Sequence, residues 1–378
     1  MRATPRWVPA PTEWEGISVE VDRAGIARTA KKLGGEGTNV LLLKTTRPVE
    51  VGVLDAALPA DRGDSPANGG WSAGPKGWML LIEGLDEQVD PWIDDLAKAL
   101  ADVGVEGTLT GAPAVGPPRW AQMVSRDARW LSASIGFRTS VGSALRLRNG
   151  WAAGPAARDI VVAVGLRWLT AHDGDLMAST GEGANFWVDA STAAAMFTEH
   201  ITQGGNAVSG SYDRARQDIR HVSTTLPSAM TLSSESGNLP WQQTVEELRA
   251  ALIAMPLDLV SMAMIGYRYL STYFALSGDA FDSMAYLHHP ERWDEFVLEP
   301  SGIQILTDRH LEHARDLSEW RTTRLDGDHV LVEARDLGPW FATRRRQHES
   351  PDPDLVAQAR RDFGDMILTP GRAQQFGL

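Results

Sequence analysis

The sequence predicts an α+β protein of two domains, with split-βαβ (ferredoxin-like) character and mixed or antiparallel sheets. Strand–helix–strand patterns occur in both halves of the chain, over residues 78–110 and again over 245–267 together with 302–333. The 378 residues are enough for two domains of ordinary size. No motif recurs with a period of about 20–50 residues, which argues against solenoid and propeller folds.

The first domain is predicted over residues 1–112. The polar–apolar alternation of residues 17–21 predicts a strand, residues 24–33 a short helix, and residues 39–44 a second strand. The segment 58–77 is rich in Gly, Pro, Asp and Ser. A stretch of this length and composition predicts a long mobile loop.

The clearest local pattern follows this loop. Residues 78–82 form a short apolar run of strand length, and residues 105–110 predict another strand. Between them, Asp90 is a good N-cap before Pro91, and Gly104 ends the helix. The apolar residues of this helix recur at steps of three or four, which predicts one buried face: Val89, Trp92, Ile93, Leu96, Leu100 and Val103.

A linker is predicted at residues 111–118, before an acidic second domain over residues 120–342. Within that domain, the apolar residues 159–170 predict a strand and residues 185–188 another. Ser191 is a suitable N-cap for a helix that continues to about residue 202.

Residues 209–238 are polar and carry no clear periodicity. After them, residues 245–255 predict a helix, residues 257–267 a buried strand, and residues 302–306 a further strand. A helix is predicted over 308–317.

The domain ends in a predicted hairpin. Residues 320–325 and 329–333 alternate on either side of an Asp326-Gly327 turn, which is a strong hairpin signal. Residues 343–378 are predicted to be a C-terminal tail with a short helix.

Composition excludes several kinds of chemistry. The chain has no cysteine, so it has no thiol nucleophile, thiolate metal site or disulfide. It has no lysine after Lys98, so that stretch holds no phosphate-loop or Schiff-base lysine. No Gly-x-Ser-x-Gly, His-Glu-x-x-His or EF-hand pattern occurs. We therefore expect no cofactor.

Charge is divided unevenly between the two halves of the sequence. Residues 1–150 contain 17 basic and 18 acidic residues, a net charge of −1, whereas residues 151–378 contain 19 and 31, a net charge of −12. An acidic half attracts a basic protein and repels nucleic acid and anionic membranes. The alternative explanation of the acidity is solubility.

The sequence favours a cytoplasmic location. Residues 1–16 contain no apolar stretch typical of a secretory signal. The most apolar window, residues 248–276, is interrupted by Pro256, Asp258 and Arg268, so a membrane span is not expected.

Four of the nine histidines lie between residues 288 and 313 and are the candidate metal ligands. His310 and His313 are three residues apart on a predicted helix, so their imidazoles can face one site. His288 and Glu291 could complete a zinc site there. The alternative is that these histidines are ordinary loop and half-buried residues.

Tryptophans beside glycine or proline in predicted loops are the candidate interface residues. They are Trp71, Trp151, Trp241 and Trp340. Exposed indole rings anchor many protein interfaces, but buried ones belong to the core. Basic residues are not interleaved with them, so a nucleic-acid surface is not indicated.

Three functions are compatible with these observations. The first is a non-enzymatic protein-binding or inhibitory protein, of the immunity type, whose acidic C-terminal half docks a basic partner. The second is a structural, secretion-related or phage-related assembly component. The third is a metal-dependent hydrolase that uses the histidine cluster.

Overall fold

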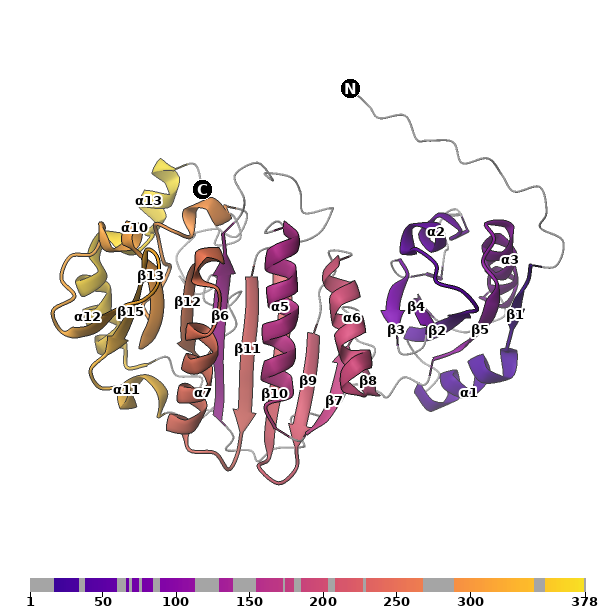
Figure 1. Ribbon diagram of the computed structural model, residues 1–378, viewed down its shortest axis with the longest axis horizontal. Helices are drawn as coiled ribbons and strands as arrows, with labels where there is room; N and C mark the ends of the chain where they lie inside the picture. Colours follow the sequence, from indigo (N-terminus) through magenta and orange to yellow (C-terminus); the bar gives the residue numbers. More distant parts are fainter. Residues whose placement is uncertain are drawn as a thin grey trace. The chain divides into compact units, whose positions relative to one another are not determined.

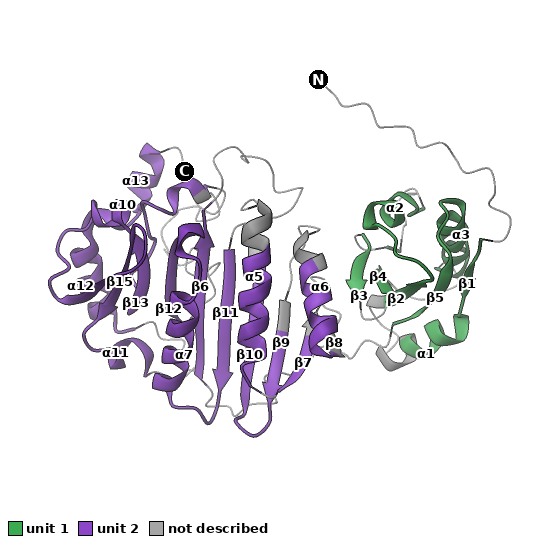
Figure 2. Ribbon diagram, viewed as in Figure 1, with its two compact units in different colours: residues 1–116 green, residues 117–378 purple. Residues whose placement is uncertain are grey.

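The computed structural model forms two compact units, residues 1–116 (unit 1) and residues 117–378 (unit 2), which are coloured separately in Figure 2. The predicted linker at 111–118 spans the boundary between them. The structure describes residues 17–33, 38–59, 66–67, 70–74, 77–83, 89–112, 129–138, 154–172, 174–179, 185–202, 208–226, 229–267, 289–342 and 351–376.

Unit 1 has a five-stranded mixed sheet with the strand order β1-β5-β2-β4-β3. Strands β5, β2, β4 and β3 are antiparallel neighbours, and helices follow β2 and β4, which is the ferredoxin-like βαββαβ arrangement. Strand β1 extends this sheet by pairing parallel to β5. The elements are β1 (Val19–Val21), α1 (Arg23–Leu33), β2 (Thr38–Thr45), α2 (Val51–Ala56), β3 (Ser72–Gly74), β4 (Gly77–Glu83), α3 (Val89–Asp102) and β5 (Gly107–Gly111).

The core of unit 1 follows from the apolar stripe of α3. Ile93, Leu96 and Leu100 are fully buried and belong to one cluster with Leu43 of β2 and Leu80 of β4. The 58–77 segment is not one continuous loop, because β3 lies within it and pairs with β4.

Unit 2 has a ten-stranded sheet in the order β14-β15-β13-β12-β6-β11-β10-β9-β7-β8, and all of its pairings are antiparallel. Figure 1 shows α5, α6 and α7 along one face of this sheet. The elements are β6 (Arg129–Phe137), α5 (Gly154–Leu169), β7 (Asp175–Ser179), β8 (Asn185–Val188), α6 (Ala190–Thr202), β9 (Val208–Asp213), β10 (Asp218–Leu226), β11 (Ala229–Ser236), α7 (Trp241–Ile253), β12 (Val260–Gly266), β13 (Ile303–Thr307), α10 (Asp308–Leu311), β14 (Trp320–Arg324), β15 (His329–Ala334), α11 (Gly338–Phe341), α12 (Pro353–Phe363) and α13 (Pro370–Gln375).

The split-βαβ pattern occurs twice in unit 2. Helix α7 connects β11 to β12, and β6 lies between these two strands, antiparallel to both. Helix α6 connects β8 to β9, and β7 lies between them in the same way. The predicted α+β class with mixed and antiparallel sheets is therefore confirmed.

The strand predicted over 159–170 is wrong, because this segment belongs to α5. Its run of Ile and Val residues is typical of a buried strand. The buried residues nevertheless recur with helical spacing: Val161, Val164, Trp168 and Leu169. The helical spacing of the apolar residues was therefore present in the sequence, but the many β-branched residues made the segment resemble a strand.

The unassigned segment 209–238 contains β9, β10 and β11. Several of their buried side chains are Ser or Thr, including Ser211, Ser233 and Ser234. Small hydroxyl residues on buried strands weaken the hydrophobic signal from which strands are predicted.

The C-terminal helix is part of unit 2. Ala359 and Phe363 of α12 are buried in the same hydrophobic cluster as Trp320 and Trp340. The aromatic ring of Phe363 meets that of Trp320 edge-on, with centroids 4.9 Å apart. None of the helices in the described part of the chain is long and apolar enough to cross a membrane.

A glycine on β6 provides a test of core packing. A methyl group at Gly136 would lie 2.6 Å from Cε3 of Trp293, whose side chain is fully buried. We expect Gly136→Ala to lower the free energy of unfolding of unit 2 by about 1–3 kcal/mol in a urea titration. Gly371→Ala is the matched control, because no atom lies within 4 Å of a methyl group there. A Gly136→Ala chain as stable as this control would contradict the close packing of Trp293.

Candidate functional site

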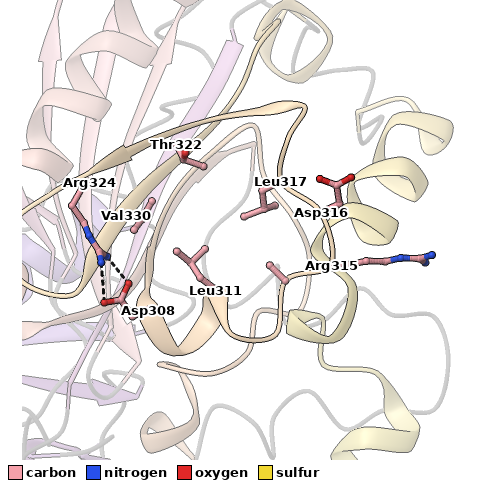
Figure 3. A pocket seen from close by; sticks show the side chains of 9 residues that line it. Asp308, Leu311, Arg315, Asp316, Leu317, Thr322, Arg324 and Val330 are labelled. Carbon is pink, nitrogen blue, oxygen red and sulfur yellow. Dashed lines mark hydrogen bonds and ion pairs between the residues drawn. The ribbon is translucent and has the colours of Figure 1, made fainter.

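A groove of about 500 Å³ lies between the loop after α10 and the β14–β15 hairpin (Figure 3). Its lining is partly apolar, through Leu311, Ala314, Leu317 and Val330. Asp308 and Arg324 form an ion pair at one side of the groove, with Nη2 of Arg324 3.2 Å from Oδ2 of Asp308. An apolar surface with charged groups at its margin is typical of a binding site.

The sequence builds the first wall of the groove from a short capped helix. Thr307 is the N-cap of α10, and its Oγ1 lies 2.9 Å from Nδ1 of His310 in a capping box. The loop that follows is fixed to α12, because the backbone N–H groups of Arg315 and Asp316 both donate to the carbonyl oxygen of Asp362. This wall is therefore held in place at both ends.

Strand β14 forms the second wall. The Asp326-Gly327 turn predicted from the sequence is present, and Gly327 adopts a positive φ of 71° that favours glycine. Leu325 N–H donates to the carbonyl of His329, which fixes the alternation of hydrogen-bonded pairs along the hairpin. The side chains of Thr322 and Arg324 are exposed and line the groove.

The edge of β14 is open at two residues. Because pairs alternate, Trp320, Thr322 and Arg324 direct their backbone groups away from β15. Trp320 N–H donates to the carbonyl of Leu317. Thr322 and Arg324 have no backbone partner on that side among the described residues, so the strand presents free donors and acceptors beside the groove.

Of the predicted metal ligands, His310 and His313 have clear structural roles. The side chain of His310 is fully buried, and burial lowers its pKa to about 3, so the ring is neutral. Its Nδ1 accepts from the N–H of Thr307 at 3.2 Å. The ring of His313 stacks on Phe296, with centroids 5.4 Å apart.

The other two predicted ligands do not join them. Glu291 pairs with Nδ1 of His289 at 2.8 Å, and His288 lies outside the described residues. Within the described ranges, no group of three or more His, Asp and Glu side chains is arranged to hold a metal ion. The metal site therefore stays a prediction without structural support from these residues.

The predicted interface tryptophans have different surroundings. Trp71 and Trp340 are each 3% exposed, so they belong to the cores of their units and are not free to anchor a partner, contrary to the prediction. Trp241 is half-buried at the start of α7, where its ring lies 6.2 Å from that of Phe341. Trp151 lies outside the described residues. Trp241 and Trp340 are in helices rather than in the predicted loops.

A buried serine–histidine pair occurs on the sheet of unit 2. Oγ of Ser211 lies 3.2 Å from Nε2 of His172, and Nδ1 of His172 accepts from the N–H of Gly174 at 3.0 Å. Because Nδ1 accepts, the ring proton is on Nε2, which then donates to the serine. Burial lowers the pKa of His172, with a further contribution from Arg220. This arrangement holds the serine in place and does not activate it as a nucleophile.

A buried charge cluster lies next to this pair. Arg220 is 2% exposed and donates from Nε to Asp218 at 3.0 Å, and Asp218 itself has no exposed surface. Ser234 donates to the second oxygen of Asp218 at 2.6 Å. The guanidinium also pairs with Glu247 of α7 and lies 4.5 Å from the ring centroid of Trp168. Every charge in the cluster has a partner, so none is left buried without compensation.

Sequence reasoning missed both the charge cluster and the groove. Asp218 and Arg220 are two residues apart, so they share one face of a strand, and this spacing was the available signal for the cluster. No local sequence pattern indicates the groove, because its two walls come from separate segments that only tertiary packing brings together.

Comparisons with known proteins do not identify a family. No family model and no curated protein matches the chain. One solved structure, the Trypanosoma brucei AdoMetDC-delta26 monomer, aligns with 81% of this chain and 87% of its own length at 8% identity, with a TM-score of 0.21. This similarity is too low to support a shared fold or function.

Proposed function

We propose that the chain is a non-enzymatic protein-binding or inhibitory protein of the immunity type, acting on a basic protein in the cytoplasm. The observation that carries the proposal is the groove beside β14, where an apolar lining, a charged margin and an open strand edge occur together. These are the features by which proteins recognise other polypeptides. The net charge of −13 supports a basic partner and disfavours nucleic acid.

The division of charge needs correction. At the structural boundary, residues 1–116 contain 11 basic and 17 acidic residues and residues 117–378 contain 25 and 32, so the two units carry −6 and −7. The difference from the earlier division arises because residues 117–150 contain six arginines and one acidic residue. Both units are acidic, and the support for a basic partner comes from the net charge of the whole chain.

The proposal predicts binding that weakens with salt. We expect the purified chain to capture a basic protein from its native lysate at low ionic strength, and to lose most of it near 1 M salt, where the Debye length falls to about 3 Å. Mass spectrometry identifies the captured protein, and titration with the purified partner measures the affinity. Capture that is unchanged at high salt would contradict an electrostatic contribution from the acidic surface.

The assembly alternative has one observation in its favour. An open strand edge such as that of β14 can pair with a second copy of the same chain. Light scattering of the purified chain tests this alternative, because an assembly component that pairs through the β14 edge forms oligomers whose size grows with concentration.

A further inference from the structure

We infer that the face of the unit 2 sheet opposite α5, α6 and α7 binds a small, uncharged, polyhydroxylated molecule of the sugar class. The site is a hydroxyl patch on the adjacent strands β10, β11 and β6, which lie side by side in the middle of the sheet (Figure 1). The patch consists of Ser132, Ser134, Ser223, Thr231, Ser233 and His221. This inference does not depend on the proposed binding of a basic protein.

The strand register places these six side chains on one face of the sheet. They form two rows across the three strands, which are Ser132, Ser233 and His221, and then Ser134, Thr231 and Ser223. Residues two apart on one strand point to the same face. Because neighbouring strands lie about 4.8 Å apart and alternate residues about 7 Å apart, the patch measures about 7 by 10 Å. A hexose ring fits within this area.

The opposite face of the same strands has the usual composition of a core. Leu131, Ala133 and Ile135 alternate with the serines of β6 and belong to the hydrophobic cluster of unit 2. Leu232 of β11 and Val222 of β10 belong to the same cluster. Strands that are buried on both faces usually carry apolar side chains on both. The hydroxyl patch departs from this rule, and buried hydroxyls cost free energy unless they form hydrogen bonds.

The patch contains a buried hydroxyl that is not satisfied. Ser233 is 1% exposed, and its Oγ has no hydrogen-bond partner in the part of the chain that the structure describes. By contrast, Oγ of Ser132 donates to the carbonyl of Gly266 at 3.4 Å. Two strands beyond Ser134 on the same face, Gln304 is fully buried, and neither polar atom of its amide has a partner among the described residues. Such atoms are rare in folded proteins and indicate bound water or a ligand.

The patch is a low area between larger side chains. Its first row is flanked by Gly266 of β12 and Gly210 of β9, which have no side chains. Trp293 lies over Gly136 at one end of the patch, and the half-buried Trp130 lies on the same face at the other end. The hydroxyl-bearing residues are at most 6% exposed, whereas His221 is half-buried. Solvent therefore reaches the patch from its β10 side.

The side chains of the patch select an uncharged ligand with many hydroxyl groups. Each serine or threonine hydroxyl can both donate and accept a hydrogen bond, as each sugar hydroxyl can. The patch contains no lysine or arginine, so an anion such as phosphate would lose its hydration without gaining a cationic partner. An apolar ligand would leave the hydroxyl of Ser233 unpaired. A neutral sugar supplies partners for the patch and has no charge to compensate.

Saturation-transfer NMR of the full chain tests the site, with D-glucose, D-galactose and D-mannose as separate probes. We expect at least one of them to bind saturably at millimolar concentration or below, and we expect an excess of inorganic phosphate not to displace it. If none of the three sugars binds, the patch holds water only and the inference is overturned. Displacement of the sugar by phosphate would show an anion site and would overturn the predicted ligand class.

Two adjacent serines separate binding from folding. Ser233→Ala removes the unpartnered hydroxyl, so we expect sugar binding to weaken about tenfold while the urea midpoint stays the same or rises. Ser234→Ala is the matched control on the opposite face of β11, where the hydroxyl donates to Asp218 at 2.6 Å. This control should lower the urea midpoint and leave the sugar affinity unchanged. A Ser233→Ala chain that binds sugar like the wild type would place the ligand elsewhere and overturn the inference.

A second variant keeps the test decisive if Ser233→Ala does not fold. Thr231→Val replaces one hydroxyl of the patch by a methyl group of similar shape, and we expect it to weaken sugar binding by a similar factor. Full affinity in this variant would exclude the patch as the site. Capture of a basic protein by a chain that binds no sugar would overturn this inference alone and leave the proposed function intact.

Discussion

Replacement of Arg220 by alanine is expected to lower the free energy of unfolding of unit 2 by about 3–5 kcal/mol, the usual effect of removing one partner of a buried ion pair. Asp218 has no exposed surface and would lose the guanidinium that donates to it at 3.0 Å. Trp168 would lose the cation above its ring. The measurement is a urea titration that follows tryptophan fluorescence and circular dichroism.

Two further variants show whether the effect comes from the unpaired buried charge. Arg216→Ala removes an arginine whose side chain is 45% exposed and pairs with Asp213, so we expect a change within about 0.5 kcal/mol. The double variant Asp218→Leu with Arg220→Met removes both charges, and we expect it to recover most of the lost stability. An Arg220→Ala chain within 1 kcal/mol of wild type would mean that Asp218 gains water or another partner.

Acid is expected to destabilise unit 2 through His310. Burial lowers the pKa of this imidazole in the folded chain to about 3, whereas an unfolded histidine has a pKa near 6.5. Between these values the unfolded state binds one more proton than the folded state, so stability falls as the pH falls. The contribution is about 1.4 kcal/mol per pH unit, or about 2 kcal/mol lost between pH 6.5 and pH 5.

The His310→Asn variant isolates this contribution. An asparagine oxygen can accept from the N–H of Thr307 as Nδ1 of His310 does, so the capping of α10 is kept without a titrating group. Urea titrations at several pH values should give a shallower pH dependence for the variant, by about one proton below pH 6.5. Parallel curves for the two chains would show that His310 gains a proton in the folded state.

The sequence predicted elements best where local patterns agreed with burial. The helix α3 has clear periodicity and the hairpin has a strong turn signal at Asp326-Gly327, and both elements are present. The predicted N-cap of α3 is wrong, because the helix begins at Val89 and Asp90 lies in its first turn, where it pairs with Arg23. Prediction from the sequence failed at α5, where β-branched residues concealed a helical spacing, and at β9–β11, where buried serines concealed strands. The helix predicted over 308–317 is shorter, Asp308–Leu311, because the following loop is held by α12.

The candidate site was less predictable than the fold. His310 was singled out correctly as a special residue, but its role is to cap a helix in the core, and composition alone cannot separate a buried cap from a metal ligand. The groove depends on contacts between residues 308–317 and the β14 hairpin, and its free edge becomes evident only from the pairing register.

The central position of β6 has a consequence for how the chain folds during synthesis. It is the first strand of its sheet to be made, yet its partners come much later: Ser132 pairs with Ser233 of β11 and with Gly266 of β12. At ~5–20 residues per second, the ribosome needs about 5–20 s to proceed from Phe137 to Ala229. During that interval both edges of an apolar strand are unpaired and open to aggregation or chaperone binding. A topology whose strand partners are so distant in sequence also folds slowly. The chain loses conformational entropy when the long loop closes, and the strand contacts that compensate for this loss form only afterwards.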